Sequence, residues 1–325
     1  KMIELSGSDI PLRFSVCAHR KIGKRYAEAW QNTARVMQIS SFIPALLCGD
    51  ANIPIDFGSG CGTGLMNYHR KLWEDKIIDA AAQDLIGGTS ALRDKLPEIV
   101  HPLQTVGKIA PWFVARYQLN RECRVIAGSG DNPQSKVLAS GDLLSLGTSF
   151  VYMVNSGNTS EFTSKSALDF SGSANAMYDG LGRAFNFACR TNGALTWDKL
   201  RLLYKIPMKD FVASEHALEN VDAGSLLRFW HPDSESFPLI NANAEIQRFD
   251  NQAIDFAHDY SALVDSALGL MYRFGAKIKN TSEAAKMVGV CGGPSASPQI
   301  LARVAAIWNC PALEMGQAGA GGGED

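Results

Sequence analysis

The sequence predicts an α/β fold, and three observations support this. Several short apolar strands end in glycine-containing turns, and between them apolar residues recur at helical spacing. The 325 residues are 46% hydrophobic and 20% charged, which is typical of a globular protein with a large core. The pattern changes near residue 120, from mostly helical segments to strands that alternate with helices. A length of this size corresponds to about two domains at ~150 residues each.

The first 120 residues contain mainly helical patterns. Apolar spacing predicts helices over 26–47, 73–86 and 106–117. Gly49 and Asp50 mark the end of the first of these helices. A short extended segment at 53–56 leads into a glycine-rich stretch, Gly58–Gly64, which is expected to be a loop.

The remaining residues combine strands and helices. Short apolar runs predict strands over 124–127, 143–146, 150–154 and 287–291. Helical spacing predicts helices over 193–204, 251–279 and 298–308. Since only Gly147, Thr148 and Ser149 separate two of the strands, these strands are expected to form a hairpin.

Charge and cysteine content exclude several classes of protein. The net charge is −2, from 31 basic and 33 acidic residues, so there is no basic surplus for binding nucleic acid. No apolar run reaches the ~18 residues of a membrane-spanning helix, so no membrane partner is expected. The seven scattered cysteines lack a C-x-x-C pair, and we expect free thiols in the cytoplasm. No residues show metal-ligand spacing, and a homodimer is left open.

Three glycine-containing loops follow apolar strands, at 128–132, 147–149 and 292–297. Backbone amides can approach an anion closely where Cβ atoms are absent, so these loops suit phosphate oxygens. A tight turn without a ligand is the alternative for any one of them. Three such loops together favour a nucleotide or another phosphorylated ligand. Neither a P-loop motif nor a G-x-G-x-x-G motif occurs in the sequence.

Asp131 is the acidic residue with the clearest chemical potential. It lies between Gly130 and Asn132, directly after one of the predicted strands and its glycine loop. A carboxylate there could accept the proton of a substrate hydroxyl that attacks phosphorus. The alternative is an Asx turn, in which the carboxylate only satisfies the backbone of its own loop.

In their order and spacing, five segments resemble the FGGY carbohydrate kinases, and within that family the D-xylulose kinases. They are Leu12–Phe14, Pro54–Asn67, Ala127–Pro133, Leu144–Ser149 and Cys291–Ser297. Three positions depart from the family pattern: Ser59 replaces a frequent aspartate, Pro294 a small residue, and Ser297 a frequent asparagine.

The resemblance implies an actin-like ATPase, ribonuclease-H-like kinase fold with two lobes. Residues 1–119 would be the C-terminal part of the first, sugar-side lobe, and residues 120–325 the second, ATP-side lobe without its final helix. The family's opening glycine-rich hairpin has no counterpart in this sequence, so the first lobe is expected to be incomplete.

The resemblance also implies an activity, which is the ATP-dependent phosphorylation of D-xylulose to D-xylulose 5-phosphate with Mg2+. Asp131 would be the general base and would bind the sugar together with Arg13 and Asn132. The expected ATP contacts are Gly147 and Thr148 at the phosphates and Gly292, Gly293 and Ser297 at the adenosine. Two alternatives remain, a kinase for another polyol such as ribulose or glycerol, and a regulator that binds sugar or nucleotide without catalysis.

Overall fold

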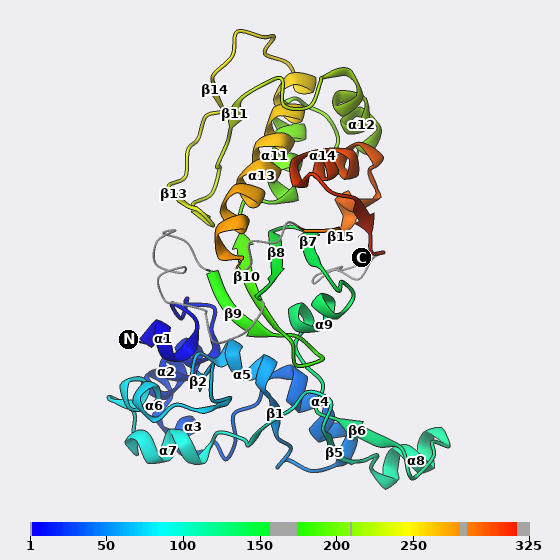
Figure 1. Ribbon diagram of the computed structural model, residues 1–325. Helices are drawn as coiled ribbons and strands as arrows, with labels where there is room; N and C mark the ends of the chain where they lie inside the picture. Colours follow the sequence, from blue (N-terminus) through cyan, green and yellow to red (C-terminus); the bar gives the residue numbers. More distant parts are fainter. Residues whose placement is uncertain (1, 157–173, 209, 280–284, 317–325) are drawn as a thin grey trace. The chain divides into compact units, whose positions relative to one another are not determined.

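The computed structural model describes residues 2–156, 174–208, 210–279 and 285–316 (Figure 1). The chain divides into two compact units. Of the described residues, the first unit contains 2–137 and 175–185, and the second contains 138–156, 174 and 186–316. This division falls after Val137, whereas the sequence placed a lobe boundary near residue 120.

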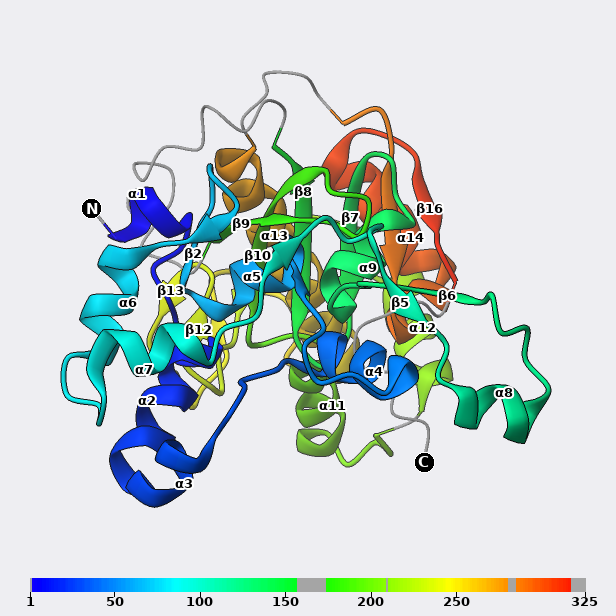
Figure 2. The ribbon, with the colours of Figure 1, turned by 90° about the horizontal axis from the view of Figure 1, so that it is seen from below.

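The first unit is mainly helical. Its helices are α1 (Met2–Ser6), α2 (Ser15–Arg25), α3 (Ala27–Asn32), α4 (Ile39–Cys48), α5 (Phe57–Thr63), α6 (Asp75–Ala82), α7 (Gly88–Asp94), α8 (Pro111–Tyr117) and α9 (Asp131–Val137). Its strands are β1 (Ile55–Asp56), β2 (Met66–Asn67), β3 (Leu72–Trp73), β4 (Ile99–Val100), β5 (Thr105–Lys108) and β6 (Arg124–Ile126). They form two-residue pairings, except that β5 and β6 make a longer antiparallel hairpin. In Figure 2, α8 lies at the end of this hairpin.

Three sequence predictions for this unit were wrong. The helix predicted over 26–47 is divided into α3 and α4, because the chain between them is extended and Val36 donates its amide to the carbonyl of Lys95. The predicted loop Gly58–Gly64 is largely α5, which begins at the N-cap Asp56 and ends at Gly64 in the left-handed region. The helix predicted over 106–117 is β5 followed by the shorter α8.

A core of apolar side chains holds the first unit together. Trp30, Leu65, Ile78 and Leu92 are each 2% exposed or less, and they belong to one buried cluster. The cluster collects side chains from α2, α3, α6 and α7, so these helices share one core although their sequence segments are short.

The second unit contains most of a mixed sheet with strand order β16-β15-β7-β8-β10-β9. Strand β9, except for Ala174, belongs to the first unit. The strands are β7 (Asp142–Leu146), β8 (Phe150–Asn155), β9 (Ala174–Tyr178), β10 (Ala184–Arg190), β15 (Val288–Cys291) and β16 (Ala312–Glu314). The predicted hairpin is confirmed, since β7 and β8 pair antiparallel with Leu146 opposite Phe150. Strand β15 pairs parallel with β7 and with β16. Strand β10 begins in the first unit, at 184–185, and continues in the second.

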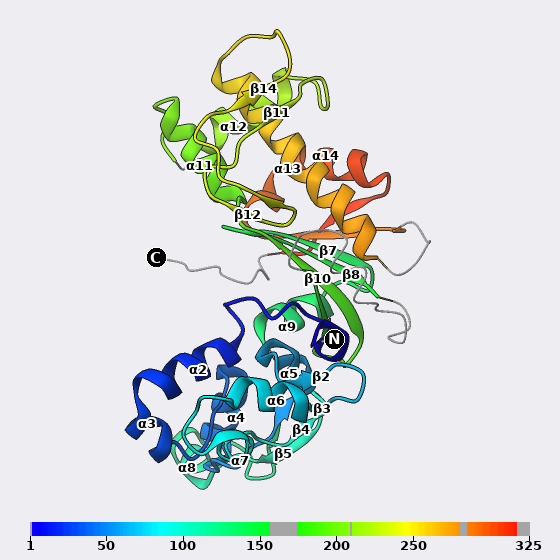
Figure 3. The same ribbon diagram turned by 90° about the vertical axis from the view of Figure 1, so that its left-hand side faces the viewer.

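Helices α13 (Phe256–Ile278) and α14 (Pro298–Trp308) lie on one face of this sheet (Figure 3). Alternate residues of β7, β8 and β15 join them in a core that includes Leu144, Tyr152, Val290 and Val304. Helices α11 (Ala194–Leu203) and α12 (Phe211–Asn220) pack against α13. The helix predicted over 251–279 begins later, because the side chain of Asp255 caps the first turn.

The sequence did not predict β9, β10, α12 or the short strands between α12 and α13. These short strands are β11 (Arg228–Phe229), β12 (Glu235–Ser236), β13 (Leu239–Ile240) and β14 (Gln247–Arg248). None of the helices in the described residues is long and apolar enough to cross a membrane.

Candidate active site

The residues implicated by the sequence fall into two groups, one in each unit, and each group is described separately. The first contains Arg13, Asp131 and Asn132, and all three belong to the first unit. The second consists of the loop between β7 and β8 and the loop between β15 and α14, and it belongs to the second unit.

Asp131 is the first residue of α9, and its side chain is exposed. Its Oδ1 accepts a hydrogen bond from the backbone amide of Asn132 at 2.7 Å and a longer one, 3.4 Å, from the side-chain amide. No described residue donates a hydrogen bond to its Oδ2. One oxygen therefore satisfies the local backbone, as the Asx-turn alternative required, while the other remains available to a substrate hydroxyl.

Asp56 supports the loop that precedes Asp131. This residue is 1% exposed, and its Oδ2 accepts hydrogen bonds from the amide of Ser59, at 2.9 Å, and from the hydroxyl of Ser129, at 3.0 Å. Burial raises the pKa of Asp56, against the effect of these hydrogen bonds, which lower it. The contact with Ser129 fixes the glycine loop two residues before Asp131.

Two further contacts lie at the beginning of α5, next to the loop before Asp131. Ser59, where the resemblance led us to expect aspartate, shares a hydrogen bond of 2.8 Å with the hydroxyl of Ser40 in α4. Gly58 allows close packing, because a Cβ atom there would lie 2.7 Å from the carbonyl oxygen of Tyr178 and 2.9 Å from the hydroxyl of Ser129. The hydrogen bond between Ser129 and Asp56 and the pairing of β6 with β5 explain why residues 120–137 pack with the first unit.

Arg13 and Asn132 are placed differently from Asp131. Arg13 lies in the turn before α2 and is exposed, and no hydrogen bond or ion pair joins it to the other two residues in the described structure. Asn132 is partly buried, and its Oδ1 has no hydrogen-bond partner among the described residues. Their predicted roles as sugar ligands stay predictions.

In the second unit, the phosphate-type loop spans Gly147 to Ser149 and connects β7 to β8. Thr148 is exposed, whereas β7 and nearly all of β8 are buried. The amide of Ala194, at the start of α11, donates to the carbonyl oxygen of Gly147 at 3.1 Å. A Cβ atom at Gly193 would lie 2.6 Å from the carbonyl oxygen of Thr148, so the beginning of α11 packs tightly against this loop.

The loop Gly292–Ser297 between β15 and α14, here called the adenosine-type loop, lies beside the phosphate-type loop. Strands β7 and β15 are parallel neighbours with Ser145 opposite Cys291, so both loops emerge from the same edge of the sheet. Gly292 has φ +96°, and a Cβ atom there would lie 2.4 Å from the carbonyl oxygen of Leu146. Only glycine fits this contact. By contrast, a Cβ atom at Gly293 would have no protein atom within 4 Å.

Ser297 has a structural role in this loop. Its hydroxyl accepts a hydrogen bond from the amide of Ile300, at 3.1 Å, and thereby caps α14. The same hydroxyl donates to the carboxylate of Glu215 in α12, at 2.6 Å. The predicted contact between Ser297 and ATP stays a prediction. Sequence reasoning missed Glu215 and the role of Asp56, because each acts through a neighbour distant in sequence. Asp56 lies in the segment Pro54–Asn67, but that pattern does not show which residue its carboxylate contacts.

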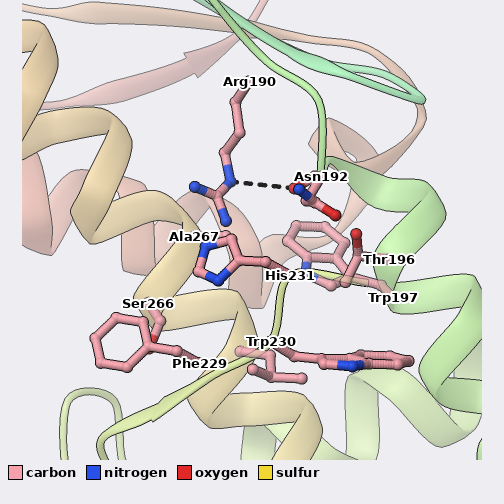
Figure 4. Close-up of a pocket in the computed structure, with 10 residues that line it drawn as sticks. Arg190, Asn192, Thr196, Trp197, Phe229, Trp230, His231, Ser266 and Ala267 are labelled. Carbon is pink, nitrogen blue, oxygen red and sulfur yellow. Dashed lines mark hydrogen bonds between the residues drawn. The ribbon is translucent and has the colours of Figure 1, made fainter. Parts of the chain in front are cut away.

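A small cavity lies within the second unit (Figure 4). Its volume of ≈ 10 Å³ suits one water molecule, and is too small for a sugar or a nucleotide. Arg190 and His231 point toward one another here, and Arg190 Nη1 and His231 Nε2 are buried without a hydrogen-bond partner among the described residues. Burial and the charge of Arg190 lower the pKa of His231 to about 4, although Glu235 acts in the opposite direction.

Two residues that line the cavity, Arg190 and Asn192, directly precede the segment that packs against the phosphate-type loop. Glu235 accepts hydrogen bonds from the amides of Thr191, at 2.6 Å, and Asn192, at 3.0 Å, directly before Gly193. It therefore fixes the segment that packs against Thr148. Among the described residues, no group of three or more His, Cys, Asp or Glu side chains forms a metal site.

The sequence is similar to xylulose kinases, although no family model matches it. The xylulose kinase of Rattus norvegicus is 36% identical over 149 residues, which are 45% of this chain and 26% of that protein. Xylulose kinase 2 of Arabidopsis thaliana is 32% identical over 154 residues, 46% of this chain and 26% of that protein. The matched segment thus covers about a quarter of the length of these relatives.

Solved structures show the same fold at lower identity. The xylulose kinase from Rhodospirillum rubrum has a TM-score of 0.80 at 16% identity, covering 98% of this chain and 63% of that chain. The glycerol kinase of Plasmodium falciparum with ADP has a TM-score of 0.79 at 14% identity, covering 96% and 62%. The predicted fold, that of the actin-like ATPase sugar kinases, is confirmed, as is the resemblance to the FGGY xylulose kinases.

Proposed function

We propose that this chain provides the catalytic aspartate and the nucleotide loops of an ATP-dependent sugar kinase whose acceptor is D-xylulose. The single most important observation is the agreement between a free carboxylate oxygen on Asp131 and the similarity to xylulose kinases. The paired loops at the edge of the second unit's sheet support the nucleotide part of the proposal. All seven cysteines are free thiols, which supports a location in the cytoplasm.

In the proposed reaction, the terminal hydroxyl oxygen of the sugar attacks the γ-phosphorus of ATP in line with the leaving group. Asp131 Oδ2 accepts the hydroxyl proton while the new oxygen–phosphorus bond forms, and the bond to the bridging oxygen of ADP breaks. Asn132 and Arg13 would orient the sugar by hydrogen bonds to its other hydroxyl groups.

The second unit would bind ATP through two loops. Backbone groups of Gly147 and the hydroxyl of Thr148 would contact the phosphates, and Gly292 and Gly293 would lie against the adenosine. The free space beside Gly293 supports this, because no protein atom there explains the absence of a side chain. Mg2+, carried by the phosphates of ATP, would neutralise part of their charge.

The proposal is tested by measuring ADP release from MgATP with and without D-xylulose, using ribulose and glycerol as alternative acceptors. We expect D-xylulose to stimulate release most strongly. If only ribulose or only glycerol stimulates ADP release, that compound is the substrate and D-xylulose is not. Binding of sugar or nucleotide with no stimulation by any acceptor would favour the non-catalytic regulator.

The variant Asp131→Asn tests the proposed base. We expect turnover to fall at least ~10²-fold, because the amide cannot accept the hydroxyl proton. D-xylulose binding, measured by calorimetry, should remain within a few fold, because the side chain keeps its size. Nearly unchanged turnover would exclude Asp131 as the base.

A further inference from the structure

Glu215 holds the adenosine-type loop from outside, and nothing in the sequence pointed to it. It lies in α12, and each of its two carboxylate oxygens accepts one hydrogen bond from a residue at the end of the loop or the start of α14. Oε2 accepts from the hydroxyl of Ser297 at 2.6 Å, and Oε1 accepts from the amide of Gln299 at 3.1 Å. Both donors belong to the junction between the loop and α14.

Helix α12, which carries Glu215, is fixed in place by a cap, a buried hydrogen bond and core packing. Asp210 caps its first turn through the amide of Ala213, at 3.0 Å. The neighbouring residue, Ser214, is buried and accepts a hydrogen bond from Arg201 at 2.8 Å. Ala217 and Leu218, on the next turn, are each 2% exposed and belong to the main core. Glu215 is therefore presented to the loop by a fixed element.

The hydrogen bonds of Ser297 connect Glu215 to the rest of the loop. The Ser297 hydroxyl also caps α14, while the Ser295 hydroxyl closes the turn by donating to the carbonyl oxygen of Gly292 at 2.7 Å. Gly292 in turn rests against Leu146, the residue before the phosphate-type loop. The amide of Ser297 also donates to the carbonyl oxygen of Pro294 at 3.1 Å, within the same turn. A set of contacts thus leads from Glu215 through this turn to Gly292, which is proposed to lie against the adenosine.

The charge of Glu215 also matters. An unpaired helix N-terminus attracts anions, because its amides are free and the helix dipole is positive there. At α14 the carboxylate of Glu215 already takes one of these amides, that of Gln299. A phosphate group would meet a like charge at this place, so the loop suits the uncharged nucleoside part of the nucleotide.

We propose that Glu215 is a positioning residue for ATP, which orients the loop Gly292–Ser297 and keeps phosphate away from the N-terminus of α14. The inference rests on the proposed kinase function. It assigns no contact between Glu215 and ATP. Its effect is transmitted through Ser297 and the first turn of α14.

The test compares Glu215→Ala with Glu219→Ala, since Glu219 is exposed one turn later on the same helix. In Glu215→Ala we expect the KM for MgATP and the Kd for MgADP to rise about tenfold, with the KM for D-xylulose within twofold of the parent value. This size corresponds to the loss of about one hydrogen bond to a charged group. The Glu219→Ala variant should match the parent protein in all three constants.

Two additional measurements separate this role from a general loss of stability. Ser297→Ala should raise the same nucleotide constants. The effect of the double variant should be smaller than the sum of the two single effects, because both changes remove the hydrogen bond between Ser297 and Glu215. Glu215→Gln should recover part of the affinity, since an amide can still accept from Gln299. Additive effects, or equal changes in the sugar and nucleotide constants, would overturn the inference.

The outcome is distinguishable from a failure of the proposed function. If the parent protein neither binds MgADP nor releases ADP in the presence of sugar, the kinase proposal fails. If the parent protein does both and Glu215→Ala has the nucleotide constants of Glu219→Ala, only the role of Glu215 is rejected.

Discussion

The two groups of candidate residues are positioned by different physical means. In the first unit, the loop before Asp131 is held by side-chain hydrogen bonds to a buried carboxylate, that of Asp56. In the second unit, the two loops proposed to bind nucleotide are held by strand register and by close backbone packing at Gly292. Single polar substitutions should therefore disturb the first group, whereas the addition of a Cβ atom should disturb the second.

The largest effect on stability is expected for Gly292→Ala. Alanine would have to adopt the positive φ of this position, +96°, and its Cβ atom would overlap the carbonyl oxygen of Leu146. We therefore expect the free energy of unfolding to fall by at least about 3 kcal/mol. Denaturant unfolding measures this. Gly293→Ala is the matched control, and its change should be below ~1 kcal/mol because the added atom meets open space. Equal losses in both variants would refute the steric argument.

His231 should give the second unit a pH-dependent stability. Its pKa is lowered from 6.5 to about 4, so between these values the unfolded chain binds a proton that the folded protein does not. The contribution of His231 is therefore complete above pH 6.5 and is lost as the pH falls toward 4, by about 3 kcal/mol.

Unfolding of the parent protein and of His231→Gln should be compared between pH 4 and 7. The parent protein should lose stability relative to His231→Gln as the pH falls from 7 to 4, because glutamine does not titrate. A difference that stays constant across this range would show that the histidine has an ordinary pKa in the folded state.

Ser129→Ala tests the hydrogen-bonded group in the first unit. Removal of the hydroxyl leaves Asp56 with one fewer donor, so we expect stability to fall by ~1 kcal/mol and turnover to fall about tenfold. Steady-state kinetics with D-xylulose measures the second effect. Ser90→Ala, at an exposed serine of α7, should leave both quantities unchanged. Full activity in Ser129→Ala would show that Asp131 is positioned without this contact.

The smallest effect is expected for Thr148→Ala. The exposed hydroxyl makes no hydrogen bond within the described structure, so its loss should leave stability unchanged while the KM for MgATP rises about fivefold. Thr148→Ser keeps the hydroxyl and should retain most of the affinity. If the KM for D-xylulose rises instead, Thr148 belongs to the sugar site.

The sequence predicted those parts of the fold that local patterns determine. The hairpin around Gly147, the buried strand before Gly292 and the helix α14 were predicted correctly, because apolar runs and glycines mark their limits. The division of the helix over 26–47 was not, since it depends on a backbone contact between Val36 and Lys95, which are far apart in sequence.

The candidate site shows the same limit. Motifs placed Asp131 and the glycine loops in their expected positions at strand ends and helix starts. They could not predict Asp56 or Glu215, whose importance lies in the contacts with Ser129 and Ser297, 73 and 82 residues away in sequence. Long-range hydrogen bonds of this kind leave no periodic signal.

The course of the chain between the two units has a practical consequence. The chain enters the second unit after Val137, yet residues 175–185 belong to the first, and β10 continues from there into the second. Neither unit is thus one continuous stretch that could be expressed alone. A fragment that begins at residue 120 would retain Asp131 but lose Asp56, so its inactivity would say nothing about the carboxylate it still carries.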